Sequence, residues 1–387
     1  MTPLKKLPST VLALGFVSLL TDMSSEMIYP LLPVFLTTVL GTGAFALGII
    51  EGTAEMTASI LKILSGYLSD RTERRKPMVM VGYTLSSLMR PLIGLATVWH
   101  QVLFFRFMDR VGKGLRTSPR DALIADVTDE KIRGKAYGLH RAMDHAGAVI
   151  GPIIAILLLN IFHLSLRKIF LLAIVPGIIV ILTLKTVVKE QRGSNKGMGK
   201  KNVSSKGHYG KNFFIFITAV TVFTLGNSSD AFLLLRLSQS GIDTTHVVFL
   251  WSLFHIVKMG STYLLGMISD RIDKKKMIIS GWLYYSIIYL LFAILQDVST
   301  LVVLFLLYGV HFGFTEPAER AWISSLVAKQ LRGRGFGIYH GIVGIATLPA
   351  SMIFGLLWQR FGYSYAFFTG ALLAFISCLI ISRVRSS

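Results

Sequence analysis

The chain contains a succession of long apolar runs, each near the ~20 residues that an α-helix needs to cross a bilayer. The runs lie near residues 10–38, 44–68, 77–98, 100–125, 133–158 and 166–187, and then near 212–237, 245–268, 276–296, 299–327, 333–357 and 363–384. A helix satisfies its own backbone hydrogen bonds, which lipid cannot do. The pattern therefore predicts an all-α membrane protein with twelve transmembrane helices.

Charged residues make up only 16% of the 387 residues, against about a quarter in a soluble domain. A formal net charge of +20 is compatible with nucleic-acid binding. The Lys and Arg residues, however, gather in short segments between the apolar runs. This distribution is typical of the loops of a membrane protein. We therefore expect contact with membrane lipid and no nucleic-acid partner.

Loop charges predict the orientation of the chain. Cations concentrate in alternate loops, at residues 71–76, 131–135, 189–211, 271–276 and 329–334. Loops rich in Lys and Arg stay on the cytoplasmic side. We expect a multi-pass protein of the bacterial inner (plasma) membrane with both termini in the cytoplasm.

The two halves of the chain repeat. Residues 66–71 and 266–271 both read Gly-x-x-Ser-Asp-Arg, and the Arg-Gly-rich segment 133–138 matches 332–337. Repeated halves are common in secondary carriers, which bind solute between the repeats near the middle of the membrane. The sequence thus divides into an N-terminal bundle (1–188), a basic linker (189–211) and a C-terminal bundle (212–387).

These motifs resemble those of the major facilitator superfamily. The resemblance implies two pseudo-symmetric six-helix bundles, transport by alternating access and a monomer. It also implies that the loop after the second span is a cytoplasmic gate, with Asp126 as a partner. The gate residues would be Gly66, Asp70, Arg71, Arg74 and Asp126, with Gly266, Asp270 and Arg271 in the second copy.

A second motif, Gly147-x-x-x-Gly151-Pro152, is similar to the antiporter motif of that family and favours export. Glycine and proline let helices approach closely and bend. The residues after Pro152 depart from the family pattern. Arg106 is the best match to the arginine that the family carries in its fourth span, although Arg110 stands where the pattern has glycine.

Ionisable residues inside the spans indicate functional positions, because burying them in a membrane is costly. Asp22 and Glu26 lie one helical turn apart in the first span, as do Glu51 and Glu55 in the second. A carboxylate in an interior of low dielectric is suited to carrying a proton. We expect these four acids to include the proton-coupling site.

The fourth span carries a stripe of cations on one face, which cannot lie against lipid. Two interpretations stay open: most of these cations pair with acids on other helices, or some bind an anionic solute. Arg110 and Arg116 are the residues that we expect to contact solute. The cavity candidates are Arg90, Arg106, Arg110, Arg116, Arg120, Asp230, Arg236, His255, Lys258, His311 and Glu316.

The sequence offers no sign of an enzyme, a metal site or a cofactor. Its single cysteine is Cys378, and no nucleophile–base or nucleotide-binding pattern is present. The pair His140 and Asp144 has ligand spacing, but we interpret it as a hydrogen-bonded pair. The expected function is proton-coupled export of a small amphipathic or anionic compound. The alternatives are import of an organic anion such as a polycarboxylate or siderophore, and a membrane receptor without transport.

Overall fold

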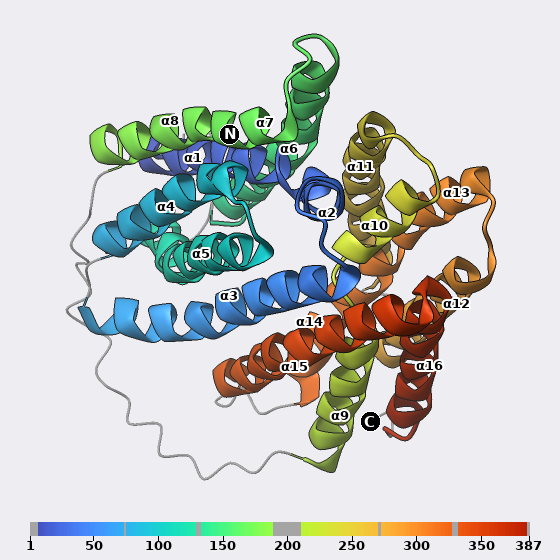
Figure 1. The fold of residues 1–387 in the computed structure, drawn as a ribbon. Helices are drawn as coiled ribbons and strands as arrows, with labels where there is room; N and C mark the ends of the chain where they lie inside the picture. Colours follow the sequence, from blue (N-terminus) through green and yellow to red (C-terminus); the bar gives the residue numbers. More distant parts are fainter. Residues whose placement is uncertain are drawn as a thin grey trace. The chain divides into compact units, whose positions relative to one another are not determined.

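The computed structural model describes residues 7–72, 75–128, 133–188, 210–269, 272–326 and 332–384. Every regular element in these segments is helical (Figure 1). The α-helices are α1 (Ser9–Glu26), α2 (Leu32–Val34), α3 (Ala44–Thr72), α4 (Arg75–Leu92), α5 (Trp99–Val127), α6 (Arg133–Asn160), α7 (Leu166–Leu172), α8 (Ile174–Thr186), α9 (Lys211–Gly226), α10 (Ala231–Gln239), α11 (Thr244–Ser269), α12 (Lys274–Ile294), α13 (Val298–Tyr308), α14 (His311–Leu326), α15 (Arg332–Phe361) and α16 (Tyr363–Ser382). Short helical turns of other types are η1 (Tyr29–Leu31), η2 (Phe35–Val39) and η3 (Ile93–Leu95).

The helices coincide with the apolar runs of the sequence. Over the described residues, 10 helical segments are long and apolar enough to cross a membrane. Two further predicted spans are helical but fall outside this set: α5, which carries the row of cations, and α11, which holds His255 and Lys258. The prediction of an all-helical, multi-pass membrane protein is therefore confirmed. The number of twelve crossings stays a prediction.

The first and seventh predicted spans are interrupted helices. In the span Ser9–Val39, α1 ends at Glu26 and the chain continues through η1, α2 and η2. In the span Lys211–Gln239, α9 ends at Gly226 and α10 begins at Ala231. Tyr285 donates to the freed carbonyl of Gly226 at 3.1 Å. Backbone groups released by an interruption need such partners in a membrane interior.

Contacts divide the chain into two compact units. Unit 1 consists of Met1–Phe35 and Thr57–Met198, and unit 2 of Leu36–Met56 and Gly199–Ser387. Helix α3 runs without a break, so its first part belongs to unit 2 and its second part to unit 1. The predicted linker 189–211 lies outside the described residues except for its last two, and its role stays a prediction.

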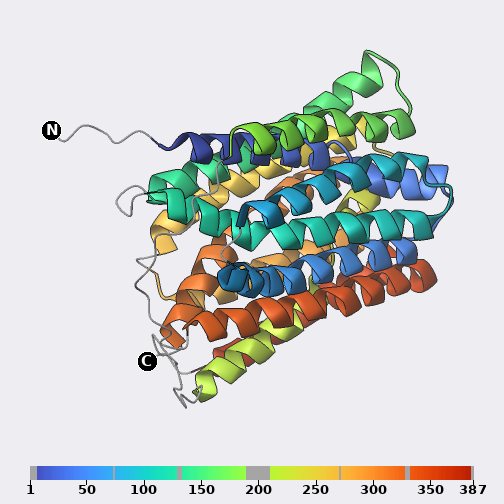
Figure 2. The same ribbon diagram turned by 90° about the vertical axis from the view of Figure 1, so that its left-hand side faces the viewer.

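Glycines allow close helix packing in unit 1. A Cβ atom added to Gly147 would lie 2.3 Å from the Leu19 carbonyl oxygen, so α6 and α1 approach closely at this point. Gly151 meets α1 in the same way one turn later. Helices α4 and α5 touch through Gly82 and Gly112. A Cβ atom added to Gly82 would lie 2.6 Å from the Gly112 carbonyl oxygen, and one added to Gly112 would lie 2.5 Å from the Gly82 carbonyl oxygen. Figure 2 shows the helices of this unit running side by side.

Unit 2 uses the same device. A Cβ atom on Gly48 would lie 2.3 Å from the Ser351 carbonyl oxygen, and one on Gly355 would lie 2.7 Å from the Ala44 carbonyl oxygen. The first part of α3 therefore packs directly on α15. Large apolar side chains elsewhere on the surface, such as Phe162, remain well exposed. Such a surface suits contact with lipid.

Candidate functional site

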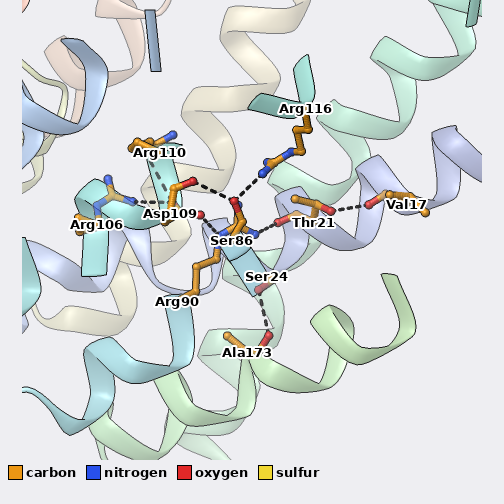
Figure 3. Close-up of polar contacts among 10 residues, drawn as sticks. All are labelled: Val17, Thr21, Ser24, Ser86, Arg90, Arg106, Asp109, Arg110, Arg116 and Ala173. Atoms are coloured by element: carbon orange, nitrogen blue, oxygen red, sulfur yellow. Dashed lines mark hydrogen bonds and ion pairs between the residues drawn. The ribbon is translucent and has the colours of Figure 1, made fainter. Parts of the chain in front are cut away.

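Asp109 of α5 lies at the centre of a charged cluster in unit 1 (Figure 3). Arg90 of α4 donates from Nε to Oδ1 of Asp109 at 2.9 Å, and the Asp109 side chain has no exposed surface. Arg106 Nη1 and Arg110 Nε lie 3.8 Å and 3.9 Å from Oδ2. One carboxylate thus faces three guanidinium groups. This arrangement offsets part of the cost of placing the α5 cations in an interior.

The same cluster links α1, α4 and α5. Arg90 also donates to the Thr21 carbonyl oxygen at 2.7 Å. Arg116 donates to Ser86 Oγ at 2.6 Å, and its guanidinium carbon lies 4.5 Å from the centre of the Tyr83 ring. Arg116 is 4% exposed. The span-four cations therefore have protein partners in unit 1, and contact of Arg110 or Arg116 with solute stays a prediction.

A second group of charges lies where α1 meets α6. Ser18 donates to Asp144, and His140 Nδ1 lies 3.6 Å from the other carboxylate oxygen of Asp144. Asp22, one turn after Ser18, interacts electrostatically with Asp144. The cations that interact with Asp22 are Lys113, Arg116 and Arg90. Two carboxylates from different helices therefore interact with each other, and each has basic residues near it.

The four acids predicted for proton coupling fall in two places. Asp22 and Glu26 belong to α1 in unit 1, with the Cβ of Glu26 close to Gly151. Glu51 and Glu55 belong to the part of α3 in unit 2, where Glu51 is 1% exposed. The members of each pair lie on one helix, and the proton-coupling role of the four acids stays a prediction. Helical spacing could not show which unit each pair would join.

Unit 2 has its own polar cluster next to the interruption before α10. Tyr308 donates to Asp230 Oδ1 at 2.7 Å. Lys258 Nζ lies 4.0 Å from Glu316 Oε1 and 3.4 Å from the centre of the Phe312 ring. Asp230 interacts electrostatically with this lysine, and also with Glu316 and Glu55. Residues from α3, α11, α13 and α14 therefore meet at the start of α10.

The remaining predicted cavity residues of unit 2 have separate partners. Arg236 donates to the Leu295 carbonyl oxygen at 3.2 Å and lies 3.8 Å from the centre of the Tyr363 ring. His311 is buried, and its Nδ1 lies 2.8 Å from the Tyr308 carbonyl oxygen. His255 packs edge-on against aromatic neighbours in α11. The partners of Arg236 are thus different from those of Asp230.

The predicted gate is described only in part. Arg75 pairs with Asp126, and Gly66 packs against Ser118 of α5. The side chains of Asp70 and Arg71 lie outside the described part of the chain, as do Arg74, Asp270 and Arg271 entirely, while Gly266 lies within α11. Arg120 donates to its neighbour Asp121 at 2.8–2.9 Å. The gating role of the motif stays a prediction.

The described residues include no set of side chains arranged to bind a metal ion. Within the described segments, no group of three or more His, Cys, Asp or Glu residues is placed to hold a metal ion. The pair His140 and Asp144 lies instead beside Ser18 and Arg141.

Several residues of these clusters were not among the predicted site residues: Asp109, Asp144, Tyr308 and Phe312. Asp109 and Asp144 carried a usable signal, because both are acids inside spans that also hold cations. The aromatic partners carried none, since a Tyr or Phe in a span is most often part of the packing.

Comparison with known proteins places this arrangement in a family. The profile of the Major Facilitator Superfamily matches residues 14–314 and 236–386. An uncharacterized MFS-type transporter of Methanocaldococcus jannaschii is 34% identical over 387 residues, covering 97% of this chain and 95% of its own. The multi-drug resistance efflux pump PmrA of Streptococcus pneumoniae is 24% identical over 379 residues, covering 94% and 93%.

Solved structures share the fold. A D-xylose–proton symporter matches with a TM-score of 0.77 at 15% identity, covering 98% of both chains. The shared fold, the profile match along most of the chain and the archaeal relative agree with the repeated motifs at residues 66–71 and 266–271. The protein is a transporter of the major facilitator superfamily.

Proposed function

We propose that this transporter exports a small amphipathic organic compound in exchange for protons, by alternating access. The observation that carries the proposal is the pair of carboxylates Asp22 and Asp144 in the interior of unit 1. They come from α1 and α6 and interact electrostatically with each other. Like charges repel strongly where water is scarce, and a proton bound to the pair removes that repulsion.

The surroundings of the pair make its proton occupancy responsive. Lys113 and Arg116 attract the carboxylate of Asp22, so the balance between a bound proton and a cation at Asp22 depends on where these cations lie. Asp144 in turn accepts a hydrogen bond from Ser18 and lies beside His140. A small displacement of α5 relative to α1 would therefore change how readily the pair binds a proton. This is the link between proton binding and helix movement that a coupled carrier needs.

Export of an amphipathic compound is favoured by two observations. PmrA, which is named as a multi-drug resistance efflux pump, matches almost the whole chain. In addition, Arg90 is paired with the carboxylate of Asp109, which neutralises one of the positive charges that could otherwise attract an anion. The packing of Gly147 and Gly151 against α1 supports the part that the antiporter motif would play.

Import of an organic anion is the second proposal, and one observation favours it. Three guanidinium groups, those of Arg90, Arg106 and Arg110, face the single carboxylate of Asp109. This local excess of positive charge would attract a carboxylate of a solute. We further propose that both termini lie in the cytoplasm, since the basic loops alternate along the sequence. We also propose that the protein works as a monomer, as its membership of the family implies.

Flux measurements in proteoliposomes test the proposal. The full chain is reconstituted with a pH-sensitive dye inside, and ethidium or citrate is added with and without a pH gradient. We expect ethidium to drive proton movement, and Asp22→Asn or Asp144→Asn to reduce it at least ~10-fold. Asp297→Asn, on the exposed N-terminus of α13, is the matched control. Proton movement driven by citrate alone would favour the anion importer, and full activity of both variants would refute the proton site.

A further inference from the structure

The ammonium group of Lys258 occupies an aromatic and acidic position inside unit 2. Its Nζ lies 3.4 Å from the centre of the Phe312 ring and 4.0 Å from Glu316 Oε1. It also interacts electrostatically with Asp230. An ammonium over the face of an aromatic ring is attracted by the negative charge density of that face. The lysine therefore fills a position built to hold a cation.

The walls of this position are fixed by the packing of α11 against α14. A Cβ atom on Gly313 would lie 2.5 Å from the Ser261 carbonyl oxygen, and Ser261 Oγ donates to the Gly309 carbonyl oxygen at 3.2 Å. The Phe312 ring packs against Tyr308 and His311, at centroid distances of 5.7 Å and 4.0 Å. The ring is thus packed against aromatic neighbours, whereas a lysine side chain has four rotatable bonds and can adopt other rotamers.

Lys258 is held more loosely than the arginines of unit 1. The Lys258–Glu316 distance of 4.0 Å is beyond a charge-assisted hydrogen bond, which spans about 2.7–2.9 Å. The two side chains are 22% and 32% exposed, against 4% and 0% for Arg90 and Asp109. An ion pair that is long and partly exposed contributes little to stability. The lysine can therefore leave without unfolding its surroundings.

The charges around Lys258 suit a cation and oppose an anion. Asp230 interacts electrostatically with two further carboxylates, Glu316 and Glu55, and with the ammonium of Lys258. An anionic solute placed on the Phe312 ring would face these carboxylates. An amphipathic organic cation would match both the ring and the acids.

We propose that Lys258 is a tethered substitute for the solute, holding the cation position of unit 2 until an amphipathic organic cation displaces it. The proposal rests on the proposed function, since it names the chemical class of the exported compound. Lys258 is then a specificity-determining residue. In the empty carrier it offsets part of the negative charge of these acids, and a cationic solute must bind more strongly than the lysine does.

Equilibrium binding of tetraphenylphosphonium to the purified full chain in detergent tests this proposal. Lys258→Met removes the competing charge and keeps the length of the side chain, so we expect binding about tenfold tighter. Lys258→Arg keeps a cation and should bind as the parent does. Glu316→Gln should weaken binding. Lys185→Met, which removes an exposed cation at the end of α8, is the matched control and should have no effect.

A double variant gives an independent check. If the lysine competes for the carboxylate of Glu316, the gain from Lys258→Met should shrink at least ~3-fold when Glu316→Gln is also present, because the two residues are coupled. Unchanged or weaker binding by Lys258→Met would overturn the proposal, as would additive effects in the double variant. Binding of citrate that is lost in Lys258→Met would assign the lysine to anion binding and overturn it as well.

Binding needs no gradient, so this test is separate from that of proton exchange. If the variants bind tetraphenylphosphonium as expected but the protein moves no protons, the cation position is supported and the proton-exchange mechanism is refuted. If the protein exchanges ethidium for protons but Lys258→Met does not bind tetraphenylphosphonium more tightly, the exchange mechanism is supported and the proposed role of the lysine is refuted. Melting temperatures of all variants establish that each one is folded.

Discussion

Arg90 and Asp109 form a hydrogen-bonded ion pair between α4 and α5, with side chains 4% and 0% exposed. Because Arg106 and Arg110 also face this carboxylate, it stabilises more positive charge than a single pair would. We expect Asp109→Asn to destabilise the protein by about 3–5 kcal/mol, since it leaves buried cations without their counter-charge. Thermal unfolding in detergent measures the effect.

The control for Asp109 is the double variant Asp109→Asn with Arg90→Met. Removing a cation together with the acid should recover part of the lost stability, because one uncompensated charge disappears. A double variant as unstable as the sum of the two single variants would contradict the idea that their charges are coupled.

Glycine at position 147 is required by the contact between α6 and α1. An added Cβ would lie 2.3 Å from the Leu19 carbonyl oxygen, so Gly147→Ala should cost about 1–3 kcal/mol of stability. Gly260→Ala in α11 is the matched control, since nothing lies within 4 Å of its added Cβ. It should be neutral or stabilising by up to ~1 kcal/mol. Equal melting temperatures for the two variants would disagree with the packing of α1 on α6.

Arg116 is expected to need its guanidinium and not only its charge. It donates to Ser86 and lies over the Tyr83 ring. Lysine cannot reproduce the planar group, so Arg116→Lys should lose about 1 kcal/mol and Arg116→Gln more. The midpoint of unfolding by guanidinium chloride or by heat measures the order of stability, which should be parent, Arg116→Lys and then Arg116→Gln. If solute contacts Arg116, the variants should lose more free energy of solute binding than free energy of unfolding. A binding isotherm measured on the same variants would show this difference.

Glu55 of α3 has an electrostatic link to a second carboxylate, Asp230. Of the variants Glu26→Gln, Glu51→Gln and Glu55→Gln, we therefore expect the last to change proton-coupled flux most, by about tenfold. The dye assay in proteoliposomes measures all three under one gradient. Full coupling in every variant would remove these three residues from the proton site and leave Asp22 with Asp144.

Asp297 gives a prediction about pH outside the membrane-spanning segments. Its carboxylate accepts hydrogen bonds from the backbone and hydroxyl of Thr300 at the start of α13, and these bonds lower its pKa. The stability from this carboxylate is then present above its unfolded pKa of about 3.9 and lost as pH falls through the lower folded value. The difference in melting temperature between the parent and Asp297→Ala should be constant near neutral pH and shrink below about pH 4. A difference that grows on acidification would contradict this sign.

The sequence predicted the helices well because lipid imposes a simple rule on length and polarity. Even α5 was placed correctly, although its cations keep it outside the set of apolar spans. The interruption at residues 227–230 was not predicted, because small residues such as Gly226 and Ser229 occur in both continuous and interrupted membrane helices. Its stability depends on a hydrogen bond from Tyr285, a residue far along the chain.

The charged residues were identified from the sequence, but most of their partners were not. One of the two interpretations of the sequence paired most of the α5 cations with acids on other helices. The structure adds Asp109, from the same helix, as the acid that three arginines face. Pairing is decided by how α4 packs on α5 through Gly82 and Gly112, and helical spacing alone does not contain that information.

The continuous helix α3 has a consequence for separate fragments of this chain. A cut within residues 189–209 severs the chain between its halves but leaves residues 36–56 on the N-terminal piece. The C-terminal piece, made alone, would then lack the helix that covers Ser351 and Gly355 of α15. Its α15 would then expose the surface around Gly355 that the first part of α3 covers in the whole protein. We expect this piece to aggregate when expressed alone and to become soluble in detergent when the N-terminal piece is expressed with it.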